Sequence, residues 1–313
     1  GDKAEILYAK GSNIYYDAET EKAATGIRPL ERGDNRELLE EALRMASRSD
    51  IIVAALGECA EMSGESASRT SLAIPDAQQD LLKALVKTGK PVVLLLFTGR
   101  PLVLNWEDAN VHSILNVWFG GSETGDAVAD VLFGKITPSG KLTTTFPRSV
   151  GQLPLFYNHL NTGRPDPDSH IFNRYASNYL DESNEPLYPF GYGLSYTDFV
   201  YGELQISSET LPKNGELTVS VTVTNKGNYD GYETVQLYLR DIYAEVARPM
   251  KELKGFERIF LKSGESRDVK FVITKDDLKF YNSELHYVYE PGEFDVMVGP
   301  NSRDVQTKSF QAE

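Results

Sequence analysis

The sequence predicts an α/β domain, an open sandwich on a mostly parallel sheet, followed by an all-β domain. Continuous apolar runs such as IIVAALG (51–57) and PVVLLLF (91–97) alternate with helical patterns in the first half of the chain. Such runs are typical of parallel strands that are covered on both faces. From Phe199 onward, apolar residues instead recur at every second position, as in strands with one buried face. Residues 151–198, rich in proline and aromatic residues, separate the two patterns.

Residues 1–150 form the predicted α/β domain. A helix over 35–49 is indicated by the capping residue Asp34 or its neighbour and by an apolar stripe at helical spacing. A second helix begins at Pro75, where a missing N–H costs nothing, and ends at Gly89. The strands 51–57 and 91–97 flank this helix.

Three further elements complete the predicted α/β domain: a strand over 113–119, a helix within 120–134, and a last strand near KLTTTF (141–146). The connections have the length of βαβ units. The chain opens on a strand-like run, Glu5–Ala9, with no cap or leader before it. We therefore expect it to start inside a longer protein, so that its sheet lacks the first strand or strands.

Residues 199–313 form the predicted all-β domain. The alternation in ELTVSVTVTN and YETVQLYLRD places two apolar sets on buried faces, namely Leu217, Val219, Val221 and Val223, and Val235, Leu237 and Leu239. Several short alternating strands over this length predict a β-sandwich. The chain has a single cysteine, Cys59, which favours a fibronectin type III-like sandwich over a disulfide-bonded immunoglobulin one. Residues 151–198 are predicted to be a connector that packs across the domains.

Charge and composition exclude several kinds of partner. The formal net charge is −14, which disfavours nucleic acid and anionic membranes and is indifferent to neutral sugars. No apolar run has the length of a membrane span. One cysteine permits no internal disulfide and no cysteine-based metal site, and the four histidines are scattered (His112, His159, His170 and His286). We predict neither a metal nor a cofactor.

One carboxylate is placed in an unusual setting. Glu65 lies in a loop of serine, glycine and alanine, between the strand 51–57 and the helix that Pro75 opens. Small residues on both sides leave it on a segment that can move and reach. A reaching carboxylic acid is what a glycosidase uses to protonate a leaving group. The ordinary alternative is a solvated loop glutamate.

Three neighbouring charges compete with Glu65 or support it. Glu58 follows the strand 51–57 directly, at the carboxyl end where α/β sheets place ligands. It can be catalytic, but a structural role in bonding the loop is favoured. Glu61 is interpreted as a solvated charge. Arg69 can hold Glu65 or Glu58 by a charge-assisted hydrogen bond, although a salt bridge at the helix entry is the commoner case.

Several long motifs resemble the C-terminal half of family 3 glycoside hydrolases, and of bacterial periplasmic β-glucosidases among them. They are GECAEMSGESASRTSLAIPDAQQDLLKAL, GKPVVLLLFTGRPLVL, WFGGSETGDAVADVLFGKITPSGKLTTTFPRSVGQLP, YNHLNTGRP and LYPFGYGLSYTDF. RPMKELKGFERIFLKSGES and PGEFDVMVG are similar to the fibronectin III-like domain of the same enzymes. The resemblance covers nearly the whole chain.

The resemblance implies half of an active site. The position matching the family's general acid/base is Glu65, whereas the family's nucleophilic Asp belongs to an N-terminal barrel whose motif does not occur here. It implies a retaining, exo-acting β-glucosidase, periplasmic or extracellular, with a β-glucoside or oligosaccharide as substrate and the barrel as intramolecular partner. The isolated chain is then expected to be inactive. A β-xylosidase of the same family, and a non-catalytic carbohydrate-binding or structural module, remain as alternatives.

Overall fold

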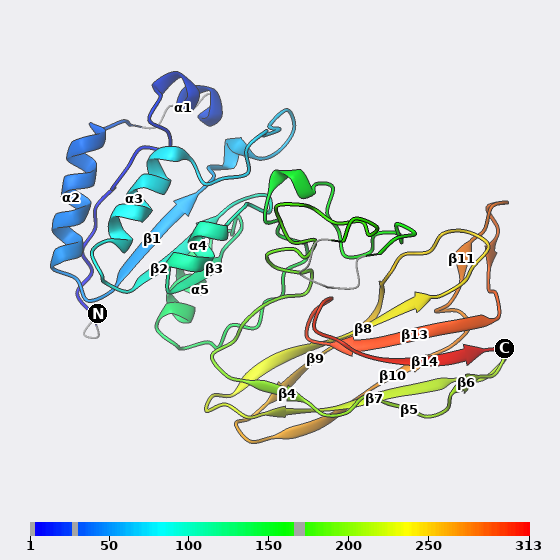
Figure 1. Ribbon diagram of the computed structural model, residues 1–313. Coiled ribbons are helices and arrows are strands. Elements are labelled where there is room, and N and C mark those ends of the chain that lie inside the picture. Colours follow the sequence, from blue (N-terminus) through cyan, green and yellow to red (C-terminus); the bar gives the residue numbers. More distant parts are fainter. Residues whose placement is uncertain (1–3, 27–30, 166–172) are drawn as a thin grey trace. The chain divides into compact units, whose positions relative to one another are not determined.

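The computed structural model describes residues 4–26, 31–165 and 173–313. The chain forms two compact units, one of residues 1–128 and 147–151, the other of residues 129–146 and 152–313 (Figure 1). The predicted combination of an α/β part and an all-β part is confirmed. Of the predicted connector, residues 166–172 lie outside the described residues, as does His170.

The first unit contains a parallel sheet of three strands in the order β1-β2-β3. These are β1 (Ile52–Gly57), β2 (Val92–Phe97) and β3 (Ser113–Asn116). The central strand β2 is apolar throughout because it has a neighbour on each side, with Val92, Leu94 and Leu96 fully buried. The two strands predicted from continuous apolar runs are therefore confirmed, and β3 is shorter than expected.

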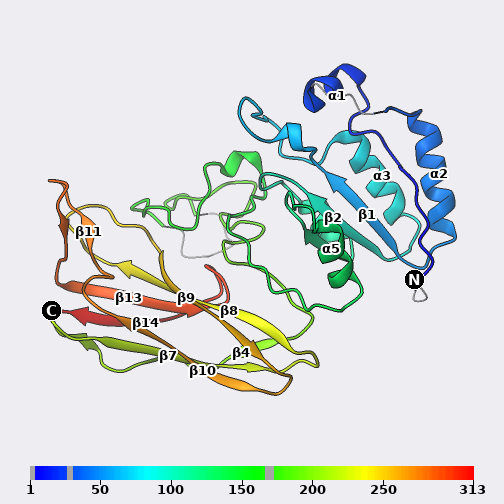
Figure 2. The same ribbon diagram turned by 180° about the vertical axis from the view of Figure 1, so that it is seen from behind.

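Two helices of the first unit precede β1 along the chain, and one helix follows each of the three strands. They are α1 (Ala18–Thr25), α2 (Asn35–Ser47), α3 (Asp76–Val86), α4 (Asn105–Asn110) and α5 (Thr124–Leu132), the last of which crosses into the second unit. Asp34 caps α2 by accepting hydrogen bonds from the N–H groups of the next turn. Helix α3 buries Leu81, Leu82 and Leu85, and both views show it beside β1 (Figures 1 and 2).

Two strands predicted from the sequence are absent from the residues described. The run Glu5–Ala9 forms no strand, since Ile6 and Tyr8 are 75% and 82% exposed and no strand pairs with it. Residues 141–146 make only an isolated bridge, Phe146 to Tyr188, because their N–H groups bond the connector instead of a sheet. In both cases the apolar pattern was present, but a strand also needs a partner in register.

The second unit contains a two-layer β-sandwich, which begins at Phe199 (Figures 1 and 2). One sheet consists of β4 (Phe199–Tyr201), β5 (Gln205–Ile206), β7 (Leu217–Asn225) and β10 (Ser266–Ile273). The other has the order β6-β14-β13-β8-β9, from β6 (Thr210–Leu211), β8 (Gly231–Asp241), β9 (Glu252–Leu261), β13 (Gly292–Gly299) and β14 (Gln306–Ala312). A short hairpin joins β11 (Phe280–Tyr281) and β12 (Tyr287–Val288).

The core of the sandwich contains the predicted apolar faces of two strands. On β7 every second residue from Leu217 to Val223 is at most 3% exposed, and on β8 the same holds for Val235, Leu237 and Leu239. These residues pack with apolar side chains of β13 and β14 in one cluster. The period of two predicted from the sequence is therefore confirmed residue by residue.

Asp241, the last residue of β8, is a buried carboxylate with a consequence for stability. It is 8% exposed, and its carboxylate interacts with the backbone N–H of Tyr243 and with the charge of Arg248. Burial raises its pKa to about 6, against the lowering effect of Arg248. Because the folded-state pKa lies above the unfolded value, the folded state binds the proton more tightly. The associated stability is present in acid and is lost as the pH rises from about 4 to 6.

Replacing Asp241 with Asn should therefore raise the melting temperature at neutral pH. Asn removes the charge that burial penalises and keeps the size of the side chain. At pH values below both pKa values, where Asp241 is already neutral, the difference should vanish. Thermal unfolding at the two pH values measures this, with exposed Glu257→Gln as the control. A gain that is independent of pH would contradict the charge argument.

Candidate active site

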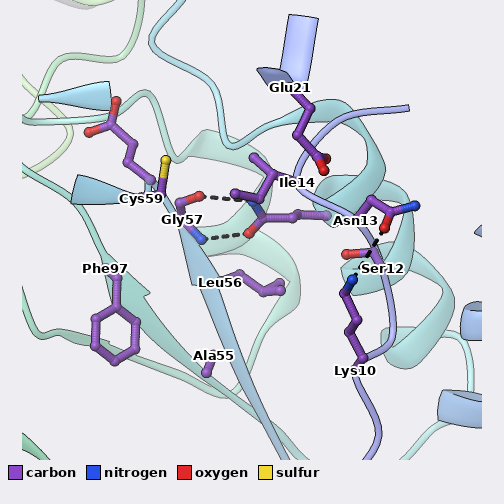
Figure 3. A pocket seen from close by; sticks show the side chains of 12 residues that line it. Lys10, Ser12, Asn13, Ile14, Glu21, Ala55, Leu56, Gly57, Cys59 and Phe97 are labelled. Atoms are coloured by element: carbon purple, nitrogen blue, oxygen red, sulfur yellow. Dashed lines mark hydrogen bonds between the residues drawn. The ribbon is translucent and has the colours of Figure 1, made fainter. Parts of the chain in front are cut away.

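The carboxyl end of β1 is held by a side chain of α3. Gln78 accepts a hydrogen bond from Gly57 N–H at 2.7 Å and donates one to Gly57 O at 2.9 Å, the two bonds drawn at Gly57 in Figure 3. Gly57 has φ = 134°, and a Cβ there would lie 1.9 Å from the carbonyl oxygen of Phe97. A glycine is required because β1 and β2 approach at backbone distance here.

Glu58 is the next residue, and its carboxylate is completely buried. Its Oε1 lies 2.8 Å from Arg69 Nη1 and 3.2 Å from Arg100 Nε. Its Oε2 accepts a hydrogen bond from Gly99 N–H at 3.2 Å and lies 2.8 Å from Thr98 Oγ1. Two guanidinium groups, one hydroxyl group and one backbone N–H therefore hold this buried carboxylate in place. These contacts favour the structural role for Glu58, as an anchor between the ends of β1 and β2.

The two arginines also bind the backbone of the loop that follows β1. Arg69 Nη2 donates to Ala73 O at 2.9 Å. Arg100 Nη2 donates to Ala67 O at 2.9 Å and to Met62 O. Of the alternatives for Arg69, the structure shows contact with Glu58 and not with Glu65.

Glu65 lies at the tip of this loop, in an exposed turn between the short helix Ala60–Met62 and α3. Its neighbours have positive φ angles, 123° at Gly64 and 58° at Ser66. Among the residues that the structure describes, nothing forms a hydrogen bond or ion pair with its side chain. Glu61 is exposed on the same segment, so geometry alone leaves two solvent-facing carboxylates.

A cavity of about 400 Å³ opens beside the carboxyl end of β1 (Figure 3). It is lined by residues of the segment 10–14, by residues of β1, and by Glu21, Glu58, Cys59, Gln78 and Phe97, but not by Glu65. Glu21 is 3% exposed and its carboxylate lies 2.7 Å from Arg32. Burial raises the pKa of the Cys59 thiol, which makes it a weak nucleophile. Both lining carboxylates, Glu21 and Glu58, are ion-paired with arginines, which favours structural roles for them.

Two features are absent from the described residues. In ranges 4–26, 31–165 and 173–313, no group of three or more His, Cys, Asp or Glu side chains is placed to hold a metal ion. Within those same ranges, every helix is too short or too polar to cross a membrane.

Sequence reasoning missed Thr98, Gly99 and Arg100, which complete the surroundings of Glu58. The signal was available, because the turn TGRP directly follows a buried parallel strand. The carboxyl ends of neighbouring parallel strands lie at the same edge of a sheet, so residues after β1 and β2 meet there.

Comparison with known proteins identifies what the chain is similar to. Residues 5–196 match the Glycosyl hydrolase family 3 C-terminal domain, and residues 233–302 match the Fibronectin type III-like domain. The chain is 48% identical to a periplasmic β-glucosidase of Salmonella typhimurium, over 99% of this chain and 41% of the relative. It is 41% identical to a β-xylosidase of Formosa agariphila, over 99% of this chain and 40% of the relative.

A solved structure gives the same result. The crystal structure of a β-glucosidase from Listeria innocua in complex with glucose superposes with a TM-score of 0.82 at 42% identity, over 87% of this chain and 38% of that one. The chain therefore spans about two-fifths of the length of the proteins it matches.

Proposed function

The chain belongs to glycosyl hydrolase family 3, and on that premise we propose that it is the C-terminal part of a retaining, exo-acting β-glucosidase in which Glu65 is the general acid/base. The observation that supports this assignment is the position of Glu65. Its exposed carboxylate lies at the tip of a loop whose base is anchored at the ends of β1 and β2. The named β-glucosidases among its relatives support the reaction class.

The proposed reaction uses two carboxyl groups about 5–5.5 Å apart. A nucleophilic carboxylate supplied from outside this chain attacks the anomeric carbon, while Glu65 transfers its proton to the glycosidic oxygen as the C–O bond breaks. The Glu65 carboxylate then takes a proton from water, whose oxygen attacks the anomeric carbon and releases the nucleophile. The sugar leaves with its original β configuration.

The rest of the complete protein has two tasks in this proposal. It supplies the nucleophile and most contacts to the terminal sugar, and it excludes water around Glu65, which is exposed in this chain. An N-terminal barrel is the proposed intramolecular partner. We also propose a periplasmic or extracellular location, which the relative from Salmonella typhimurium supports.

Hydrolysis of p-nitrophenyl β-D-glucoside by the complete protein and by this chain tests the proposal. We expect turnover by the complete protein, with β-glucose as the first anomer seen by proton NMR, and none by the chain alone. α-Glucose as the first product would rule out the retaining mechanism. Turnover by the chain alone would show that the nucleophile lies within it.

A β-xylosidase is the second candidate, because one relative that matches 99% of this chain carries that name. The ratio of kcat/KM for p-nitrophenyl β-D-glucoside to that for the β-D-xyloside distinguishes the two. A complete protein that binds glucosides but hydrolyses neither substrate would instead support a carbohydrate-binding module.

A further inference from the structure

The loop that carries Glu65 is closed at its neck by a single guanidinium group. Nη2 of Arg100 donates to the carbonyl oxygens of Met62 and Ala67, which stand on either side of Glu65 in the chain. Both ends of the turn are therefore tied to one nitrogen atom. Hydrogen bonds from a charged donor are stronger than neutral ones, so the neck is held more firmly than the tip.

Arg100 is in turn fixed to the sheet. It follows β2 by three residues, and its Nε forms an ion pair with Glu58 Oε1 at 3.2 Å, although without hydrogen-bond geometry. The remaining contacts of Glu58 come from Arg69, Gly99 and Thr98. Thr98 Oγ1 also lies 2.7 Å from Arg100 O, so its single hydroxyl proton is donated either to that carbonyl oxygen or to Glu58 Oε2. The position of the guanidinium is thus set by the ends of β1 and β2.

A second contact holds this loop against residues 98–100, the segment that follows β2. A Cβ on Gly99 would lie 2.1 Å from Ser63 Oγ and 2.8 Å from a ring carbon of Phe119. Ser63, which precedes Glu65 by two residues in the chain, is therefore packed directly on the backbone of Gly99. Three consecutive residues after β2 thus contact Glu58 or the neck of the loop.

We propose that Arg100 is a positioning residue for Glu65, an inference that rests on the proposed function. The tip has conformations that L-residues seldom adopt, as the φ of 58° at Ser66 shows. Such a conformation persists only where the surrounding structure enforces it. Arg100 enforces it by fixing both ends of the turn, and thereby sets the direction from which the carboxyl group reaches the leaving oxygen. The anchor is rigid and the tip is exposed, which suits an acid that must meet a substrate held elsewhere.

Arg100→Met and Arg100→Lys in the complete protein test this role with two substrates. Phenyl β-glucoside has a poor leaving group that needs protonation, whereas 2,4-dinitrophenyl β-glucoside has a good one that does not. Misplacing a catalytic group by about 1 Å can cost around 10²-fold. We therefore expect Arg100→Met to lower kcat/KM for the phenyl substrate by about ten- to a hundredfold and to leave the dinitrophenyl value nearly unchanged. Lys keeps the charge but not the planar fork, and should fall between Met and the unaltered protein.

Arg32→Met is the matched control. Arg32 also ties a buried carboxylate, Glu21, to backbone carbonyls in the same unit, but on a different segment. A loss of stability alone should lower kcat/KM by the same factor for both substrates, in Arg32→Met as in Arg100→Met. Equal losses for the two substrates in Arg100→Met, or no loss, would overturn the positioning role. If Glu65→Ala is itself unimpaired, the proposed function fails; if only the Arg100 variants are unimpaired, the inference alone fails.

Discussion

Replacing Glu65 with Ala in the complete protein should lower kcat/KM for phenyl β-glucoside by about 10²- to 10⁴-fold, the usual contribution of a general acid. The phenolate cannot leave readily without a proton, and Glu65 is the proposed donor. For 2,4-dinitrophenyl β-glucoside the same step needs no acid, so its kcat/KM should change little. Initial rates with both substrates measure the difference.

The second half of the reaction provides an independent readout. With the dinitrophenyl substrate the Glu65→Ala variant should accumulate the glycosyl-enzyme, because water is no longer deprotonated. Azide needs no general base, so it should restore turnover and yield β-glucosyl azide. Glu61→Ala is the control, since Glu61 is exposed on the same segment. A loss and an azide rescue in the Glu61 variant but not in the Glu65 variant would move the acid/base assignment to Glu61.

Replacing Lys141 with Met should strongly lower the free energy of unfolding. Lys141 Nζ lies 3.1 Å from Glu233 Oε1 and 3.2 Å from Gly193 O, and the Glu233 side chain is 5% exposed. Tyr201 donates a further hydrogen bond to Glu233 at 3.0 Å. Removing one partner of a buried ion pair leaves an uncompensated charge, at a cost of about 3–5 kcal/mol in the free energy of unfolding. Urea denaturation of the chain measures it.

The pH dependence identifies the cause of this loss. Burial raises the pKa of Glu233, and Lys141 acts in the opposite direction. Without Lys141 the folded-state pKa rises further above the unfolded value. Protonated Glu233 then stabilises the fold in acid, and this stability is lost as the pH rises through the folded pKa. The deficit of Lys141→Met should therefore shrink in acid and be fully present at neutral pH.

Lys141→Met combined with Glu233→Gln is the control for packing. The pair of substitutions removes both charges, so it should recover most of the stability that Lys141→Met loses. A deficit that is equal at all pH values and persists in the double variant would show that the lysine stem, and not the unpaired charge, carries the effect.

Features that are written in the local pattern of residues could be predicted from the sequence alone. The alternation on β7 and the cap of α2 depend on neighbours a few positions away, and both are present. The run 141–146 has the composition of a strand, but the N–H groups of Leu142 and Phe146 bond to Tyr192 and Tyr188 of the connector and not to a sheet. Composition cannot show such a partner, which is why that strand was predicted wrongly.

The sequence by itself determined the two kinds of fold, the family, and the placement of Glu65 in a small-residue loop between β1 and α3. These follow from periodicity and motif order, which are properties of neighbouring residues. Only the tertiary structure decided that Glu58 is buried between Arg69 and Arg100, and that Arg100 closes the loop at Met62 and Ala67. Parallel pairing of β1 and β2 brings the ends of two distant segments to one edge, and a buried carboxylate there must find its counter-charges among whatever that edge supplies.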